Sequence, residues 1–68
     1  MRRKEFEEVF LEYIEDGFRF IDLELTKDRV VSFDSEKQSY SIDDTSVSFT
    51  KDGLTETVAY DSIVSIAI

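Results

Sequence analysis

The chain has no cysteine, histidine, proline or tryptophan, and it has only two glycines. Without cysteine or histidine, neither a disulfide framework nor the usual zinc and transition-metal ligands are available. Gly17 and Gly53 are too few for a glycine loop that cradles phosphate. Positive charge is also scarce, because 8 lysines and arginines stand against 16 acids and leave a net charge of −8. Such a surface repels nucleic-acid phosphates and acidic lipid, so direct nucleic-acid binding is disfavoured.

Long apolar segments are missing as well. No stretch approaches the roughly 20 apolar residues that a transmembrane helix needs. The basic residues 2–4 are followed at once by Glu5, Glu7 and Glu8, where the apolar part of a secretion signal would have to begin. We therefore expect a cytoplasmic protein without membrane association.

What is present is apolar material sufficient for folding. The hydrophobic fraction of 41% and the aromatic fraction of 13% are too high for a disordered chain. We expect a single domain over residues 1–68. A core of this size rarely supplies more than about 3 to 5 kcal/mol of net stability, so self-association to a homo-oligomer is an expectation.

An amphipathic helix is predicted over residues 3–16. Its apolar residues follow the i, i+3, i+4 spacing of one helix face, and Gly17 supplies the stop signal. The apolar face consists of Phe6, Val9, Phe10, Tyr13 and Ile14. Acids fill an adjacent arc of about 100° and are expected to face solvent or a partner.

The acidic stripe lowers the local stability of this helix. Glu8 and Glu12, and likewise Glu12 and Asp16, are like-charge pairs that each cost about 0.2 to 0.5 kcal/mol. Glu15 and Asp16 also lie at the helix end where negative charge is unfavourable. Leu11 projects away from the apolar face beside them. The candidate partner-binding residues, called the acidic helix surface below, are Glu5, Glu8, Leu11, Glu12, Glu15 and Asp16.

Two interpretations of the acidic helix surface stay open. The first is that the surface binds a partner, because residues kept for binding often lower the stability of the element that carries them, as these acids lower the stability of the helix. The alternative is a solvated face that only keeps the protein soluble, since one exposed leucine is ordinary.

After Gly17 the apolar pattern changes to the period of two that is typical of strands. Strands are predicted over residues 18–26, 29–33, 38–42, 46–50, 54–60 and 63–68, with turns between them. Asp52-Gly53 is the strongest hairpin signal. The predicted fold class is α+β: the helix is followed by a five- or six-stranded antiparallel meander that forms a small barrel or a curved sheet.

Phe18 and Phe20 are out of phase with the aliphatic residues that follow them. Packing under the helix, or a bulge that realigns the strand, would bury their rings. Aromatic rings beside Arg19 also fit a platform for single-stranded nucleic acid. We favour two core phenylalanines that flank one exposed arginine, because the surroundings are acidic.

Residues 56–66, ETVAYDSIVSI, have the order strand, short turn and strand. This ending resembles that of Sm-like and other SH3-like small barrels. Phe33-Asp34 and Lys37-Gln38 lie where Sm-like proteins have Phe-Asp-x-x-Met-Asn, and a helix before five strands is similar too. Lys37 and Gln38 replace the methionine and asparagine of that motif, and its later Arg-Gly pair is absent, so the RNA-binding residues are not transferred.

A second partial resemblance covers residues 40–66. Tyr40-x-Ile42-Asp43, a glycine turn and the same ending are similar to part of a bacterial PH-like domain. This resemblance implies a fold and no activity.

No catalytic constellation stands out. Acids are plentiful, but none lies within an apolar run that would bury it and shift its pKa as acid–base catalysis requires. Asp43-Asp44 and Asp52-Gly53 do not complete a D-x-D-x-D-G calcium loop, and we interpret them as ordinary turns. We therefore expect no enzyme activity, no metal site and no cofactor.

The sequence thus favours a small non-catalytic interaction or regulatory protein that presents the acidic helix surface to a basic protein partner. One alternative is an acidic mimic of nucleic acid that inhibits a nucleic-acid-binding enzyme, as phage anti-restriction and anti-CRISPR proteins do. The other, implied by the resemblance, is an Sm-like RNA-binding oligomer.

Overall fold

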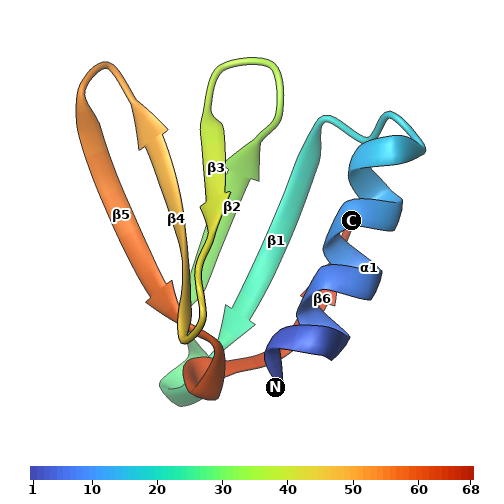
Figure 1. Ribbon diagram of the computed structural model, residues 1–68, viewed down its shortest axis with the longest axis vertical. Coiled ribbons are helices and arrows are strands. Elements are labelled where there is room, and N and C mark those ends of the chain that lie inside the picture. Colours follow the sequence, from blue (N-terminus) through green and yellow to red (C-terminus); the bar gives the residue numbers. More distant parts are fainter.

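Helix α1 and six strands make up the computed structural model, which describes all residues 1–68 (Figure 1). The elements are α1 (Arg3–Glu15), β1 (Phe20–Leu25), β2 (Val30–Asp34), β3 (Ser39–Ile42), β4 (Ser46–Lys51), β5 (Leu54–Ala59) and β6 (Ile63–Ala67). Two short 3-10 helices, η1 (Thr26–Asp28) and η2 (Tyr60–Ser62), connect β1 to β2 and β5 to β6. The expected α+β class with an N-terminal helix and antiparallel strands is confirmed. None of the helices has the length and apolar content needed to cross a bilayer.

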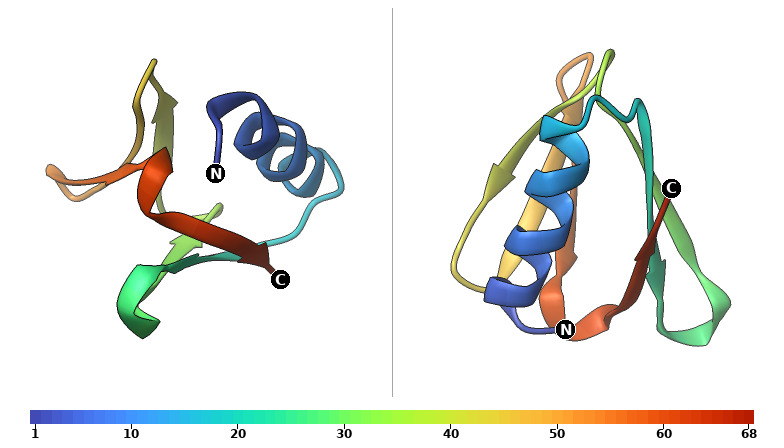
Figure 2. Two further views of the ribbon diagram at one scale, coloured as in Figure 1. Left: turned by 90° about the horizontal axis from the view of Figure 1, so that it is seen from below. Right: turned by 90° about the vertical axis from the view of Figure 1, so that its right-hand side faces the viewer.

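The strands form two antiparallel sheets of three strands each. The first sheet has the order β2-β1-β6, and the second has the order β3-β4-β5. β6 does not pair with β5, its neighbour in sequence; it pairs with β1, where Asp22 faces Ala67. The pairing is therefore not a simple meander. Both figures of the whole chain place α1 on the side away from β5 (Figures 1 and 2).

Helix α1 closes the core between the two sheets. Phe6 and Phe10, one helical turn apart, are fully buried, and their rings stack with centroids 5.0 Å apart. The ring of Phe10 also lies 5.4 Å from that of Phe33 in the first sheet and 5.9 Å from that of Phe49 in the second. The other predicted apolar positions, Val9, Tyr13 and Ile14, are half-buried. This packing fixes which face of α1 points outward.

Every strand except β3 has buried residues, and in β1, β2 and β4 they alternate with more exposed ones, as a period of two requires. The buried strand and η2 residues are Ile21, Leu23, Leu25, Val31, Phe33, Val47, Phe49, Val58, Tyr60 and Ile63. β3 contributes no buried residue, and β5 and β6 contribute one each, Val58 and Ile63.

Left-handed backbone conformations form the tight connections. Gly17, with a φ of +84°, follows the last turn of α1, and its amide donates a hydrogen bond to the carbonyl oxygen of Ile14. Asp52 and Gly53 have φ of +53° and +79°, and the residues on either side, Lys51 and Leu54, face each other. This geometry is the two-residue hairpin for which an Asp-Gly pair is typical.

The expected burial of Phe18 and Phe20 is wrong, since they are 40% and 56% exposed. Ile21 and the alternate residues after it occupy the inner phase of β1, which places Phe20 on the outer face. No bulge realigns this end, because Phe20 stays in register opposite Asp34. Phe18 precedes the strand and meets the ring of Tyr13 edge-on, with centroids 5.7 Å apart.

Candidate functional site

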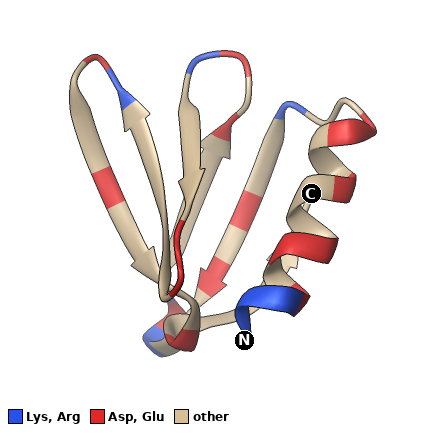
Figure 3. Ribbon diagram, in the orientation of Figure 1, with Lys and Arg blue, Asp and Glu red and all other residues tan.

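The acidic helix surface is exposed along its whole length. All six of its residues are exposed, Leu11 by 38%. Figure 3 shows the acids as a series of red segments along α1. None of the five carboxylates forms an ion pair or a side-chain hydrogen bond. These acids therefore have no structural partner within the chain.

Acids on the first sheet differ in this respect. Asp22 accepts a hydrogen bond from the hydroxyl of Ser32 over 2.6 Å, and Glu24 accepts one from Ser65 over 2.8 Å. Both are cross-strand contacts of the kind that stabilise a sheet. The carboxylates of Asp22 and Glu24 therefore support the fold, whereas the five on the acidic helix surface form no contact that would do so.

Charge along α1 opposes the helix dipole. Arg3 and Lys4 occupy the first turn, where a positive charge is unfavourable, and the last turn has no base; Glu5 is the one favourable charge of the first turn. The first residue outside the helix, Arg2, forms no side-chain cap. Arg3 is neutralised by Glu7 and by Asp44, the latter over 2.6 Å. Burial of its apolar face stabilises α1 despite these unfavourable interactions between charges and the helix dipole.

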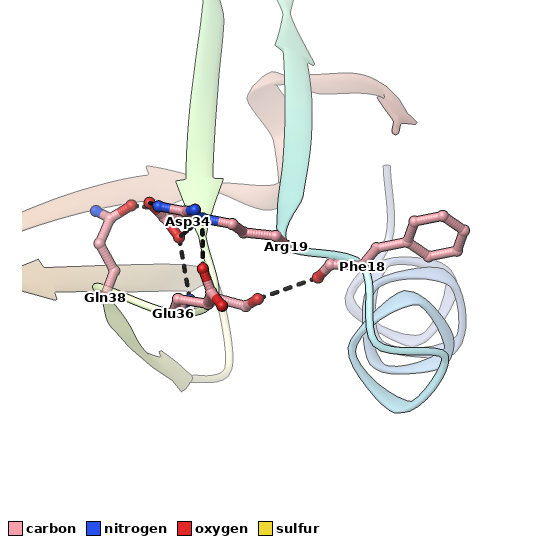
Figure 4. A network of polar contacts seen from close by, with 6 residues as sticks. Phe18, Arg19, Asp34, Glu36 and Gln38 are labelled. Carbon is pink, nitrogen blue, oxygen red and sulfur yellow. Dashed lines mark hydrogen bonds and ion pairs between the residues drawn. The ribbon is translucent and has the colours of Figure 1, made fainter.

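Arg19, which directly precedes β1, binds the last residue of β2 and the turn that follows it (Figure 4). Its Nε and Nη2 atoms donate hydrogen bonds to the two carboxylate oxygens of Asp34 over 3.1 Å each, and Nε lies 2.8 Å from Glu36. The hydrogen bond from Arg19 lowers the pKa of Asp34, and the backbone amide of Glu36 adds to this effect. The Arg19 guanidinium also lies 4.7 Å from the Phe20 ring centroid. Arg19 is thus engaged in holding the fold.

The outer face of the second sheet is uncharged and rich in hydroxyl groups. The register of β3, β4 and β5 places Ser39, Ser41, Ser46, Ser48, Thr50, Thr55, Thr57 and Ala59 on this face. Cross-strand hydrogen bonds join the hydroxyls of Ser48 and Thr57 over 3.0 Å and those of Thr50 and Thr55 over 2.9 Å. The sequence signal for this face is serine or threonine at alternate positions in three strands, and no charged motif marks it.

A cleft of about 240 Å³ lies between β5 and the turn that joins β1 to β2. We call it the β5 cleft. Leu25, Val31 and Val58 contribute apolar side chains, while Lys27 and Arg29 contribute bases. Neither base forms an ion pair. Sequence reasoning did not find this site, because its walls come from segments about thirty residues apart that no local pattern connects.

The β5 cleft also contains Glu56, Thr26, Thr57, Ala59 and Ser62. Its volume lies below the range of about 300 to 1,000 Å³ that is usual for small-molecule sites. Side chains of a docked segment fit such a space better than a large cofactor does. No three acids of the chain come together as a metal site.

Comparison of the chain with known protein families, with curated proteins and with solved structures finds no significant match.

Proposed function

We propose that this protein is a non-catalytic interaction module that binds a basic surface of a partner protein through the acidic helix surface. The supporting observation is that five exposed carboxylates without partners are held on one face of a helix whose opposite face is anchored by Phe6 and Phe10. A rigid helix presents these charges in a fixed arrangement, so a partner binds without ordering them first.

Each part of the surface has a physical role in this proposal. The carboxylates speed encounter with a basic partner through long-range attraction, which salt weakens. Leu11, exposed among them, supplies an apolar contact that excludes water once the partner has docked. The helix C-terminus adds its negative end to the field of Glu15 and Asp16.

The finer fold assignment belongs to the same proposal. We infer a small SH3-like or Sm-like barrel, in which β2 of the first sheet and β3 of the second run in opposite directions and are joined by a turn at residues 35–38 (Figure 1). The strand orders β2-β1-β6 and β3-β4-β5 and the 3-10 helix before β6 support it. Such a barrel is a scaffold for many unrelated functions and does not itself assign one.

Charge reversal on two positions tests the proposed function. A double variant with Glu12→Lys and Glu15→Lys is compared with a matched control, Asp43→Lys with Asp61→Lys, which changes the net charge equally at residues outside α1. Asp43 and Asp61 are exposed and form no ion pair. The wild type and both variants are used to capture partners from the native host, with quantification by mass spectrometry.

We expect a basic partner that the wild type and the control retain and that the helix variant loses by about tenfold or more, a change of about 1.4 kcal/mol. Equal capture by the two variants would contradict the proposal. If the partner is a nucleic-acid-binding enzyme and DNA or RNA competes for it, the protein acts as a mimic of nucleic acid.

A further inference from the structure

We propose that the free edge of β5, together with the β5 cleft, binds an extended acidic segment of another protein as an additional strand. The occupant would pair with β5 through its backbone and place alternate side chains in the cleft. This surface lies on the side of the molecule away from α1 (Figures 1 and 2), so it is distinct from the acidic helix surface.

The backbone groups of β5 that point away from β4 can be identified from the ladder. The amide of Tyr60 donates a hydrogen bond to the carbonyl oxygen of Thr45 over 3.1 Å, which continues the register of β4 and β5. Hydrogen bonding in an antiparallel pair alternates from residue to residue. With Tyr60 directed toward β4, the in-phase residues Leu54, Glu56 and Val58 are directed toward β4 as well. The amides and carbonyls of Thr55, Thr57 and Ala59 therefore face the free edge.

The β5 edge lacks most of the features that normally block strand addition. It has a neighbour on one side only, five of its six residues are exposed, and it has neither proline nor a bulge. Its one charged residue, Glu56, is in phase with the inward-facing Val58, and this inward charge is the one protective feature that the edge has. Exposed edges of this kind are templates for pairing.

The side chains that line the β5 cleft indicate which residues an added strand should carry. A strand added along β5 directs every second side chain toward Leu25, Val31 and Val58, which favours apolar residues at those positions. Lys27 and Arg29 at the same cleft have no ion-pair partner, so they favour a carboxylate in the incoming segment. In a chain of net charge −8, this cleft has two bases and one acid.

A second copy of the chain fits this edge less well. The β5 strand of a second copy would bring one acid, Glu56, to the two bases of the cleft, and its other five residues are uncharged. Two chains of net charge −8 also repel each other over long range. Charge complementarity therefore selects a foreign acidic segment.

Two substitutions at Thr57 separate backbone pairing from side-chain effects. Thr57→Pro removes an amide donor that faces the free edge and leaves the bonds between β4 and β5, and proline is tolerated at such edge positions. Thr57→Val keeps the amide and removes the hydroxyl that bonds Ser48. Circular dichroism and thermal unfolding establish that both variants fold.

The experiment is a selection of random displayed peptides, each long enough to pair along β5, on the wild type and on the Thr57→Pro variant. Selected peptides are synthesised, and their binding is measured by fluorescence anisotropy and by amide shifts in NMR spectra. We expect peptides with alternating apolar and acidic residues that shift the amides of Thr55, Thr57 and Ala59. Thr57→Pro is expected to weaken their binding about tenfold or more, and Thr57→Val less than about threefold.

Charge reversal then tests the cleft. Lys27→Glu with Arg29→Glu is expected to weaken binding about tenfold. The matched control, Lys37→Glu with Lys51→Glu, alters two bases that do not line the cleft and should leave binding within about twofold. Glu12→Lys with Glu15→Lys should leave it unchanged or tighten it, which distinguishes this site from the proposed function.

Three results would overturn the inference. The first is that no peptide is enriched on the wild type over Thr57→Pro. The second is that selected peptides are basic or uncharged, or that they shift amides elsewhere. The third is sedimentation of the wild type as a dimer that Thr57→Pro dissociates, because the occupant of the edge would then be a second copy.

Discussion

The hydroxyl of Tyr60 donates a hydrogen bond to the carbonyl oxygen of Asp43 over 2.6 Å. This contact ties η2 to the turn between β3 and β4, and the Tyr60 ring is only 3% exposed, with its centroid 5.3 Å from that of Phe6. The N-terminal amine of Met1 also donates to the carbonyl oxygen of Tyr60 over 3.0 Å. Tyr60 thus links α1, the second sheet and the start of β6.

Replacing Tyr60 by phenylalanine keeps the ring and removes this hydrogen bond. We expect Tyr60→Phe to lower the free energy of unfolding by about 1 kcal/mol, the usual net value of such a bond. Urea denaturation measures the change. Tyr40→Phe is the control, because the Tyr40 hydroxyl forms no hydrogen bond to a side chain or to the backbone, and it should alter stability by less than about 0.5 kcal/mol. Equal effects of the two substitutions would contradict a structural role for the Tyr60 hydroxyl.

Tyr60 also predicts how stability changes at alkaline pH. Burial raises the pKa of Tyr60, because the phenolate would lose hydration in the core. A raised pKa means that the unfolded chain releases the proton first, so stability is full below the ordinary tyrosine pKa of about 10 and falls above it. Urea denaturation of the wild type across this range should show the fall, and the Tyr60→Phe variant should show less of it. An identical decline in both proteins would contradict this assignment.

Adjacent residues of α1 provide a test of the core. Phe10 is fully buried among aromatic rings from both sheets, whereas Leu11 is 38% exposed. Phe10→Ala should cost about 3 to 5 kcal/mol, comparable to the whole stability of so small a domain, and should leave the chain largely unfolded. Leu11→Ala should change stability by less than about 0.5 kcal/mol. Circular dichroism distinguishes the outcomes, and unfolding of the Leu11 variant would show that Leu11 belongs to the core.

The local elements were predictable because they depend on short-range patterns. The spacing of Phe6 and Phe10 with a stop at Gly17 predicts a helix over 3–16, and the structure has α1 at 3–15. The Asp52-Gly53 pair predicts the hairpin between β4 and β5 on similar grounds. The exposure of the acidic stripe follows from the same helical period.

Long-range features were not predictable from these patterns. Pairing of β6 with β1 joins residues about forty positions apart, and no local signal specifies it. The outward position of Phe20 depends on which phase of β1 meets the core, and aromatic character alone suggested the wrong phase. The β5 cleft combines Lys27 and Arg29 with a strand distant in sequence, so its charge balance becomes visible only in the folded chain.

Asp34 predicts the behaviour of the fold in acid. Because the hydrogen bond from Arg19 lowers the pKa of Asp34, the pair stabilises the fold above the ordinary aspartate pKa of about 3.9, and this stabilisation is lost as the pH falls through the lowered value. NMR titration should give a pKa for Asp34 below the ordinary value. Arg19→Gln should move it back upward, while Lys27→Gln, at a base with no ion pair, should not. A pKa unaffected by Arg19→Gln would contradict the assigned cause.

Glu12 offers a test that separates stability from function. It lies four residues from both Glu8 and Asp16, so Glu12→Lys turns two repulsive pairs into attractive ones. We expect the free energy of unfolding to rise by about 0.5 to 1 kcal/mol at low salt, and to rise less at high salt because exposed charges are screened. Glu12→Gln, which removes the repulsion without adding attraction, should give about half the gain. A loss of stability in the Glu12→Lys variant would reveal a structural role for Glu12. If the surface is maintained for binding, the Glu12→Lys variant should be more stable than the wild type and should bind the partner less well.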